Sequence, residues 1–271
     1  MGYSDELGFA VDVVQKAAVP AMAAFGRSEL SVFEKSDGTI VTQADLDVNT
    51  LIVEALQAAY SNDAILSEEG PQDPDMRGTS RCWIVDPIDG TTHFYRKERD
   101  WSIMLALAVD RHAVVGAVYR PALGELYAGA FGEGSIYRVN GQEMNVRIDT
   151  TDPGPFRVIH GPSATGLTQP SRSSKDVCFT VAYHGLMGIL NILSSGAHAF
   201  VTARTTGHEW DLAPYAAILA ASGGVVTDLQ GRVHTFNKVD SKVRGGVIAA
   251  VSAETHDRTM TMVGEAGLVS S

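Results

Sequence analysis

The chain has 271 residues, of which 45% are hydrophobic and 20% charged, so it can bury the core of one large domain or two modest ones. This composition excludes disordered and fibrous architectures. Lysine and arginine number 21 against 32 aspartates and glutamates, and the net charge of −11 argues against binding to a nucleic-acid backbone. The excess acid either serves solubility or, where carboxylates converge, requires cations.

The first half of the chain predicts two amphipathic helices followed by two short buried strands. The first helix follows an apolar stripe with a possible bend at Pro20, and the stripe comprises Leu7, Val11, Val14, Ala18, Met22 and Phe25. A capping-box sequence at Thr42–Asp45 begins the second helix, whose apolar face extends to Ala59. The strands span 64–67 and 82–85, and each runs directly into acidic residues.

Residues 101–148 have the pattern of an antiparallel meander. Apolar runs at 102–109 and 113–119 are separated by short turn sequences, and Asn140-Gly141 marks a later turn. Turn-forming residues concentrate at 150–155, so we place a domain boundary there. The prediction is an N-terminal α+β domain of residues 1–149 and a C-terminal α/β domain of residues 150–271.

Strands and helices alternate in the second half of the chain, which is typical of an α/β layer. The apolar runs predict strands at 156–159, 177–181, 197–202, 225–229 and 247–251. Helical spacing predicts helices at 186–193, at 211–221 and from about residue 253.

Cysteine content and the N-terminus favour a cytoplasmic protein. Cys82 and Cys178 are too few for a disulfide framework and match no metal-binding spacing, so we expect both to be buried as small apolar residues. No apolar run approaches the roughly 20 residues that cross a bilayer. The acidic residues Asp5, Glu6 and Asp12 stand where a signal peptide would be basic. We therefore expect no membrane association.

The most informative segment runs from Trp83 to Phe94. A buried strand ends at Asp86, Pro87 stiffens the turn that follows, and Asp89 precedes Gly90. Two carboxylates on one tight turn can face a common centre, and hard divalent cations such as Mg²⁺ take oxygen ligands. The same residues are also ordinary turn formers, so this segment alone is equally compatible with a structural turn.

Other acidic residues stand at comparable positions. Glu68 and Glu69 follow an apolar strand, and Asp211 opens an apolar helix, where it could equally stabilise the first turn. Asp45 could be no more than the acid of a capping box. Each structural explanation is adequate alone, and it is their joint occurrence that favours a metal site.

The chain resembles the inositol monophosphatase superfamily of Mg²⁺-dependent, lithium-sensitive phosphatases. The family signature Asp-Pro-Ile/Leu-Asp-Gly-Thr stands unbroken at Asp86–Thr91. The second signature, Trp-Asp followed by a small-residue helix and Gly-Gly, runs from Trp210 to Gly224. The segments 41–45 and 66–69 match the remaining metal-site stretches. The resemblance covers nearly the whole chain and implies a layered α/β/α/β/α sandwich, with the site between two domains, in a protein that is commonly a homodimer.

The resemblance also implies a set of site residues. One Mg²⁺ would be held by Glu68, Asp86 and the carbonyl of Ile88, and a second by Asp86, Asp89 and Asp211, with Glu68 sharing a third, weaker site. Glu68 and Thr91 would activate the attacking water with assistance from Asp45. Gly90 and Thr91 would offer backbone N–H groups to the substrate phosphate. The implied activity is hydrolysis of a small-molecule phosphomonoester.

Substrate choice lies in the segment before Asp211, where Arg204 and His208 are the candidate substrate-binding residues. The acid that inositol monophosphatases place here to bind ring hydroxyls is not clearly present. The segment is similar to the 3'(2'),5'-bisphosphate nucleotidase branch, in which an arginine could bind a second phosphate. Thr92-His93-Phe94, in contrast, resembles the inositol branch, and Tyr183-His184 replaces a Gly-Ser pair of many members. Histidinol and sugar phosphates are further alternatives.

A second class of function is a non-catalytic binding protein that keeps this fold. Such a protein is expected to have lost at least one site residue, and the chain retains all five of Glu68, Asp86, Asp89, Thr91 and Asp211. The sequence therefore favours the enzyme.

Overall fold

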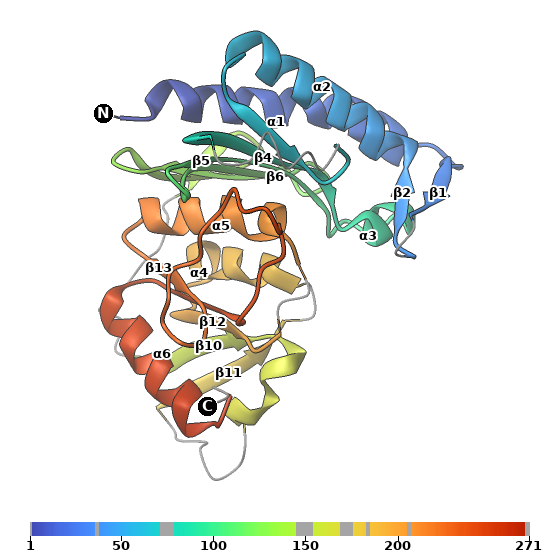
Figure 1. Cartoon of the computed structure of the whole chain (residues 1–271). Helices are drawn as coiled ribbons and strands as arrows, with labels where there is room; N and C mark the ends of the chain where they lie inside the picture. Colours follow the sequence, from blue (N-terminus) through green and yellow to red (C-terminus); the bar gives the residue numbers. More distant parts are fainter. Residues whose placement is uncertain are drawn as a thin grey trace.

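The computed structural model describes residues 2–35, 38–70, 79–144, 154–168, 176–182, 185–204 and 207–268. Its elements form five layers, in which two N-terminal helices, a seven-stranded sheet, a middle helical layer, a five-stranded sheet and a C-terminal helix follow one another (Figure 1). Three clusters of buried apolar side chains fill the spaces between the layers, and one of them covers both faces of the middle helical layer. The predicted α/β/α/β/α sandwich is confirmed.

The outer layer consists of α1 (Ser4–Phe25) and α2 (Gln43–Ala59). Helix α1 buries a stripe of small residues, namely Ala10, Val13, Val14, Ala17, Ala18 and Ala21. The stripe predicted from the sequence lies partly on another side of the helix, because it was chosen from the larger apolar side chains. Of these, Met22 is 38% exposed, and Leu7 and Val11 are half-buried. A helix that packs closely on a sheet buries small side chains, which contribute little to the apolar pattern of the sequence.

Helix α1 is long and apolar enough to cross a membrane by length and composition, contrary to the expectation from the sequence. In the structure its buried stripe packs against the seven-stranded sheet, together with α2 (Figure 1). The core helix of a globular protein satisfies the same criterion of length and composition.

The seven-stranded sheet has the order β3-β4-β5-β6-β7-β8-β9. Its strands are β3 (Ala64–Ser67), β4 (Arg81–Asp89), β5 (Ser102–Val109), β6 (His112–Arg120), β7 (Glu125–Ala130), β8 (Gly134–Val139) and β9 (Gln142–Met144). β3 and β4 are parallel, and every later pair is antiparallel. The predicted meander is therefore confirmed as far as residue 144. A separate hairpin of β1 (Val32–Glu34) and β2 (Ile40–Thr42) was not predicted.

The five-stranded sheet has the order β11-β10-β12-β14-β13 and is mixed. Its strands are β10 (Phe156–His160), β11 (Val177–Val181), β12 (Ala199–Thr202), β13 (Val225–Thr227) and β14 (Val247–Ala250). All five lie within or next to predicted strands. Cys178 on β11 is exposed, so the prediction that both cysteines are buried is wrong for this one, while Cys82 is buried.

The helices of the second half lie on both faces of this sheet. The α-helices are α4 (Leu190–Ser194), α5 (Glu209–Ala221) and α6 (Ala253–Glu265), and a 3₁₀ segment spans Pro162–Thr168. The helix predicted at 186–193 is divided, since residues Gly185–Ile189 form a 3₁₀ helix before α4. A short helix of the first half, α3 (Thr91–Tyr95), follows β4.

Helix α5 lies between the two sheets, and its residues share one core cluster with side chains of both (Figure 1). It approaches the seven-stranded sheet at Gly116, where a Cβ atom would lie 2.3 Å from the Pro214 carbonyl oxygen and 3.1 Å from Ala217 Cβ. The proposed domain boundary at 150 lies outside the described residues and stays a prediction. The packing of α5 shows that the two halves of the chain share a core.

We expect Gly116→Ala to lower the free energy of unfolding by roughly 1–3 kcal/mol, because the backbone of α5 must move away from β6. Urea denaturation measures the change. Gly8→Ala in α1 is the matched control: its Cβ would meet nothing within 4 Å, and alanine favours the helix. Equal stability of the two variants would contradict the close approach.

Candidate active site

Strand β4 carries two carboxylates to one end of the seven-stranded sheet. The strand continues through Pro87 to Asp89, which pairs with Ser102 of β5, and the register shifts between Asp86 and Asp89. The structure therefore extends the strand where the sequence predicted only a turn. Gly90 then adopts a left-handed φ of +84°, and a Cβ there would lie 2.9 Å from the Asp100 carbonyl oxygen. This position accordingly requires glycine.

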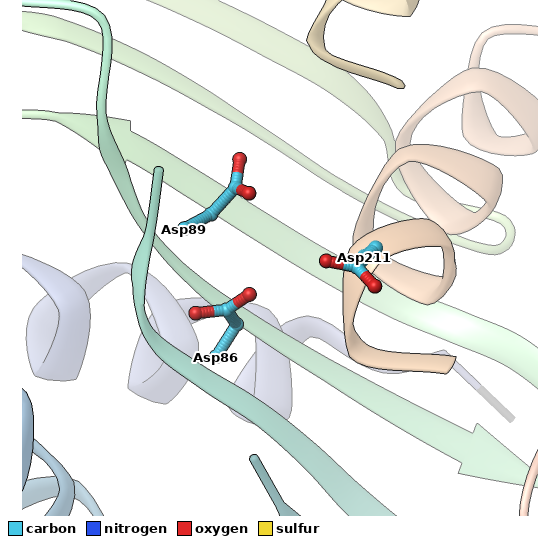
Figure 2. A group of neighbouring side chains, drawn as sticks. All are labelled: Asp86, Asp89 and Asp211. Carbon is cyan, nitrogen blue, oxygen red and sulfur yellow. The ribbon is translucent and has the colours of Figure 1, made fainter. Parts of the chain in front are cut away.

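Asp211 completes a cluster of three carboxylates. It lies in the first turn of α5, and one oxygen each of Asp86, Asp89 and Asp211 lies within 4.8 Å of the others (Figure 2). The Asp211 Oδ2 atom accepts a hydrogen bond of 2.5 Å from the His208 backbone N–H, which orients the carboxylate. Residues that are more than 120 positions apart in sequence thus converge between β4 and the first turn of α5.

The electrostatics of the cluster favour a bound cation. Asp86 is 1% exposed, and neither of its carboxylate oxygens has a hydrogen-bond partner among the described residues. Burial, together with the negative charges of Glu68, Asp89 and Asp211, raises the pKa of Asp86 well above its ordinary value. Burial also raises the pKa of Asp89 to about 6 and that of Asp211 to about 8. Oxygen ligands in this arrangement suit a hard divalent cation.

Glu68, which follows β3, is not one of the three clustered carboxylates, but, in addition to burial, its negative charge raises the pKa of Asp86 and of Asp89. A lysine that was not predicted as a site residue contacts it. Lys35 Nζ lies 2.8 Å from Glu68 Oε1 and 2.5 Å from Glu69 Oε1. Burial raises the pKa of Glu69. The lysine follows β1, more than 30 residues earlier in the chain, and no sequence pattern links it to the two glutamates. The Lys35 ammonium group therefore neutralises part of the negative charge of Glu68 and Glu69 in the structure.

Thr91 is hydrogen-bonded to Asp45. The Thr91 hydroxyl lies 3.2 Å from Asp45 Oδ1 and 3.1 Å from the carbonyl oxygen of Ile88, and it can donate to either. Asp45 also accepts hydrogen bonds from the Thr42 backbone N–H at 2.9 Å and from the Thr42 hydroxyl at 2.5 Å. The predicted capping box is therefore present, and its acid contacts a second predicted site residue. Burial raises the pKa of Asp45.

A cavity of about 450 Å³ opens beside the cluster. Asp89, Asp211 and the buried Tyr215 line its charged end, while Leu186, Met187 and Phe200 give it an apolar wall. Ser102, which also lies near, donates a long hydrogen bond of 3.4 Å to Asp89 Oδ2. Neither Tyr215 nor Ser102 was predicted as a site residue, because both belong to elements whose pattern indicates only burial.

The two candidate substrate-binding residues, Arg204 and His208, differ in whether they line the active-site cavity. Arg204 is exposed and lines this cavity, and its backbone N–H donates to the Ser163 hydroxyl at 3.0 Å. His208 caps α5, stacks on Trp210 with 4.5 Å between ring centroids and lines a neighbouring cavity instead. Tyr183 and His184 lie outside the described residues.

Glu209, next to His208, is fully buried and has a structural role that the sequence analysis missed. Its carboxylate accepts backbone hydrogen bonds from Asn237 at 2.5 Å and Lys238 at 3.0 Å. These bonds hold the segment before β14 against the start of α5.

The layered fold, together with the family model and the relatives that match the chain, identifies a phosphoric monoester hydrolase. The model of the inositol monophosphatase family matches residues 3–267, nearly the whole chain. The chain therefore belongs to the inositol monophosphatase family.

Relatives of known name cover most of the chain. It is 29% identical to the 3'(2'),5'-bisphosphate nucleotidase CysQ of Aggregatibacter actinomycetemcomitans, over 90% of this chain and 92% of that protein. It is also 29% identical to the histidinol-phosphatase of Chlorobaculum parvum, over 93% and 99%. Among solved structures, the IMPase of Thermotoga maritima matches with a TM-score of 0.75 and 26% identity, over 97% of this chain and 98% of that one. All three relatives are phosphatases, and their named substrates differ.

Proposed function

We propose that the protein is a Mg²⁺-dependent, lithium-sensitive phosphomonoesterase that hydrolyses a small-molecule phosphate by attack of an activated water. The observation that carries the proposal is the buried cluster of Asp86, Asp89 and Asp211, because three carboxylates with raised pKa values need a cation to coexist ionised at neutral pH. Membership of a metal-dependent phosphatase family supports it.

The donor set fits Mg²⁺. The unpartnered oxygens of Asp86 would bind two ions, one shared with Glu68 and the Ile88 carbonyl and the other with Asp89 and Asp211, and Glu68 would also share a third, weaker site. Bound there, Mg²⁺ would neutralise the substrate phosphate and polarise the attacking water. Lys35 contacts Glu68 in the structure, so a metal ligated by Glu68 would compete with this ammonium group for the carboxylate.

The protein's own residues orient the water and the phosphate. With its proton directed at Asp45, the Thr91 hydroxyl keeps a lone pair with which to accept a hydrogen bond from the water. We propose Glu68 as the general base, assisted by Thr91 and Asp45. The backbone N–H groups of Gly90 and Thr91 would bind the phosphate, and Arg204 and His208 would contact the rest of the substrate.

The substrate class is a small phosphomonoester. Inositol 1-phosphate and 3'-phosphoadenosine 5'-phosphate are the leading candidates, and histidinol and sugar phosphates follow. Relatives named as a bisphosphate nucleotidase and as a histidinol-phosphatase support this range. We further propose that the protein acts in the cytoplasm as a homodimer and binds neither nucleic acid nor membranes.

A phosphate-release assay tests the proposal. We expect turnover of at least one compound among inositol 1-phosphate, 3'-phosphoadenosine 5'-phosphate, histidinol phosphate and sugar phosphates. That turnover is expected to require Mg²⁺, to stop on chelation and to fall when Li⁺ is added. Phosphate release that persists in excess EDTA would contradict the assignment of the carboxylate cluster.

A further inference from the structure

A second cavity, of about 500 Å³, lies next to the active-site cavity and is lined by positive charge. Arg204, Lys242 and Arg244 line it, together with Gly245 and Gly246. Among the described residues no acidic side chain lines it. In a chain of net charge −11, three cations around one concavity are an exception to the overall balance. We call this feature the cationic cavity.

Two of these cations lack partners of their own. Neither Arg204 nor Lys242 forms an ion pair or a side-chain hydrogen bond within the described part of the chain. Arg244 pairs with Asp240 at 2.6 Å, but both side chains are more than half exposed, so solvent screens that pair. The cavity therefore holds an excess of positive charge, which an anionic ligand group would compensate.

Close backbone packing brings together the two segments that carry these cations. Gly245 and Gly246 have φ angles of +85° and +74°, and a Cβ on Gly246 would lie 2.6 Å from the Thr202 carbonyl oxygen. The segment that carries Lys242 and Arg244 consequently packs against the end of β12, directly before Arg204. Charges nearly 40 residues apart in sequence thus meet because the fold brings β12 and β14 together.

The cationic cavity adjoins the active-site cavity. Arg204 and Gly207 line both. A Cβ on Gly207 would lie 2.6 Å from Asp211 Oδ2, so the glycine brings the backbone between the two cavities close to the carboxylate cluster. A molecule whose phosphate faces the cluster can therefore extend past Gly207 toward Lys242 and Arg244.

We propose that the cationic cavity binds a second anionic group of the same substrate, a phosphate, sulfate or carboxylate, and that Lys242 and Arg244 with Arg204 select for doubly anionic phosphomonoesters. This inference rests on the proposed phosphatase function and adds two residues to its substrate recognition. Arginine and lysine bind such groups through charge-assisted hydrogen bonds.

The test compares substrates that differ by one anionic group. Adenosine 3',5'-bisphosphate is paired with adenosine 3'-monophosphate, and fructose 1,6-bisphosphate with fructose 1-phosphate, at low ionic strength with Mg²⁺. We expect the wild type to prefer the doubly anionic member of at least one pair in kcat/KM. In Lys242→Gln/Arg244→Gln that preference is expected to fall by roughly ten-fold or more, mainly through KM. Added salt is expected to reduce the preference of the wild type.

Two further variants separate recognition from net charge. Lys16→Gln/Arg27→Gln removes the same number of positive charges from exposed positions on α1 and just after it, and is expected to keep the preference. Lys242→Arg/Arg244→Lys retains both charges and is expected to restore most of it. A preference unchanged in the double glutamine variant would overturn the inference, because Lys242 and Arg244 would then not contribute to recognition of the second anionic group.

The outcomes also distinguish this inference from the proposed function. If the wild type hydrolyses monophosphates with Mg²⁺ but prefers neither doubly anionic member, the phosphatase stands and the second-anion site is wrong. If no phosphomonoester is hydrolysed at all, the proposed function itself fails.

Discussion

Replacing Asp89 by asparagine is expected to lower kcat/KM by about 10³-fold while making the metal-free protein more stable. The activity falls because a neutral amide removes one of three converging carboxylates, and metal-based charge stabilisation contributes several kcal/mol to the transition state. The stability rises because burial and neighbouring negative charge raise the pKa of Asp89 to about 6, so its ionised form costs free energy at neutral pH. We expect a gain of about 1–3 kcal/mol.

The measurements are kcat/KM with Mg²⁺ and urea denaturation in EDTA and in Mg²⁺. Mg²⁺ is expected to stabilise the wild type strongly and the variant weakly. Asp228→Asn is the matched control, because Asp228 is also buried but accepts hydrogen bonds from the backbone of Gln230 and Arg232 and from the Arg232 side chain. This control is expected to lose stability and to keep its response to Mg²⁺. A destabilised Asp89→Asn protein would argue against charge repulsion in the cluster.

The sequence predicted the residues whose chemistry and chain order form a signature. The run from Asp86 to Thr91 and the pair Trp210-Asp211 predicted the carboxylate cluster, and the structure brings these aspartates together. Lys35 could not be predicted in the same way. It contacts Glu68 and Glu69 from the turn of an unpredicted hairpin, and its sequence context is that of any exposed loop.

Other contacts depend on tertiary packing and could not be predicted from the sequence. Lys242 and Arg244 stand in an irregular segment, and the pairing of β12 with β14 and of Lys242 with His208 places them next to Arg204. On α1, Met22 fits an apolar stripe but is exposed, because close helix–sheet packing selects the alanines beside it. Patterns of hydrophobicity record which residues are apolar, whereas the distance between layers decides which of them are buried.

The stability of the metal-free protein is expected to fall as pH rises from about 4 to about 8, and Mg²⁺ is expected to remove this dependence. Burial raises the pKa of Asp89 to about 6 and that of Asp211 to about 8 in the folded state. The pKa of an aspartate in an unfolded chain is about 3.9. The folded protein therefore binds more protons than the unfolded one in this range. Its unfolding free energy then decreases with pH, since the slope follows the difference in bound protons.

Each unit of difference between the folded-state and unfolded-state pKa corresponds to about 1.4 kcal/mol, so the unfolding free energy is expected to fall by several kcal/mol between about pH 4 and pH 8. His234 has the opposite effect on stability at pH values below the ordinary pKa of histidine. Burial lowers the pKa of this imidazole, so the folded state binds fewer protons than the unfolded state there. The comparison between EDTA and saturating Mg²⁺ at each pH cancels this contribution, since His234 is not among the cluster's residues. Urea denaturation over the series is therefore expected to show a stabilisation by Mg²⁺ that grows with pH as the three carboxylates ionise. A stabilisation that is constant with pH would mean that these carboxylates are already ionised in the metal-free protein, and hence that burial and mutual repulsion do not raise their pKa values.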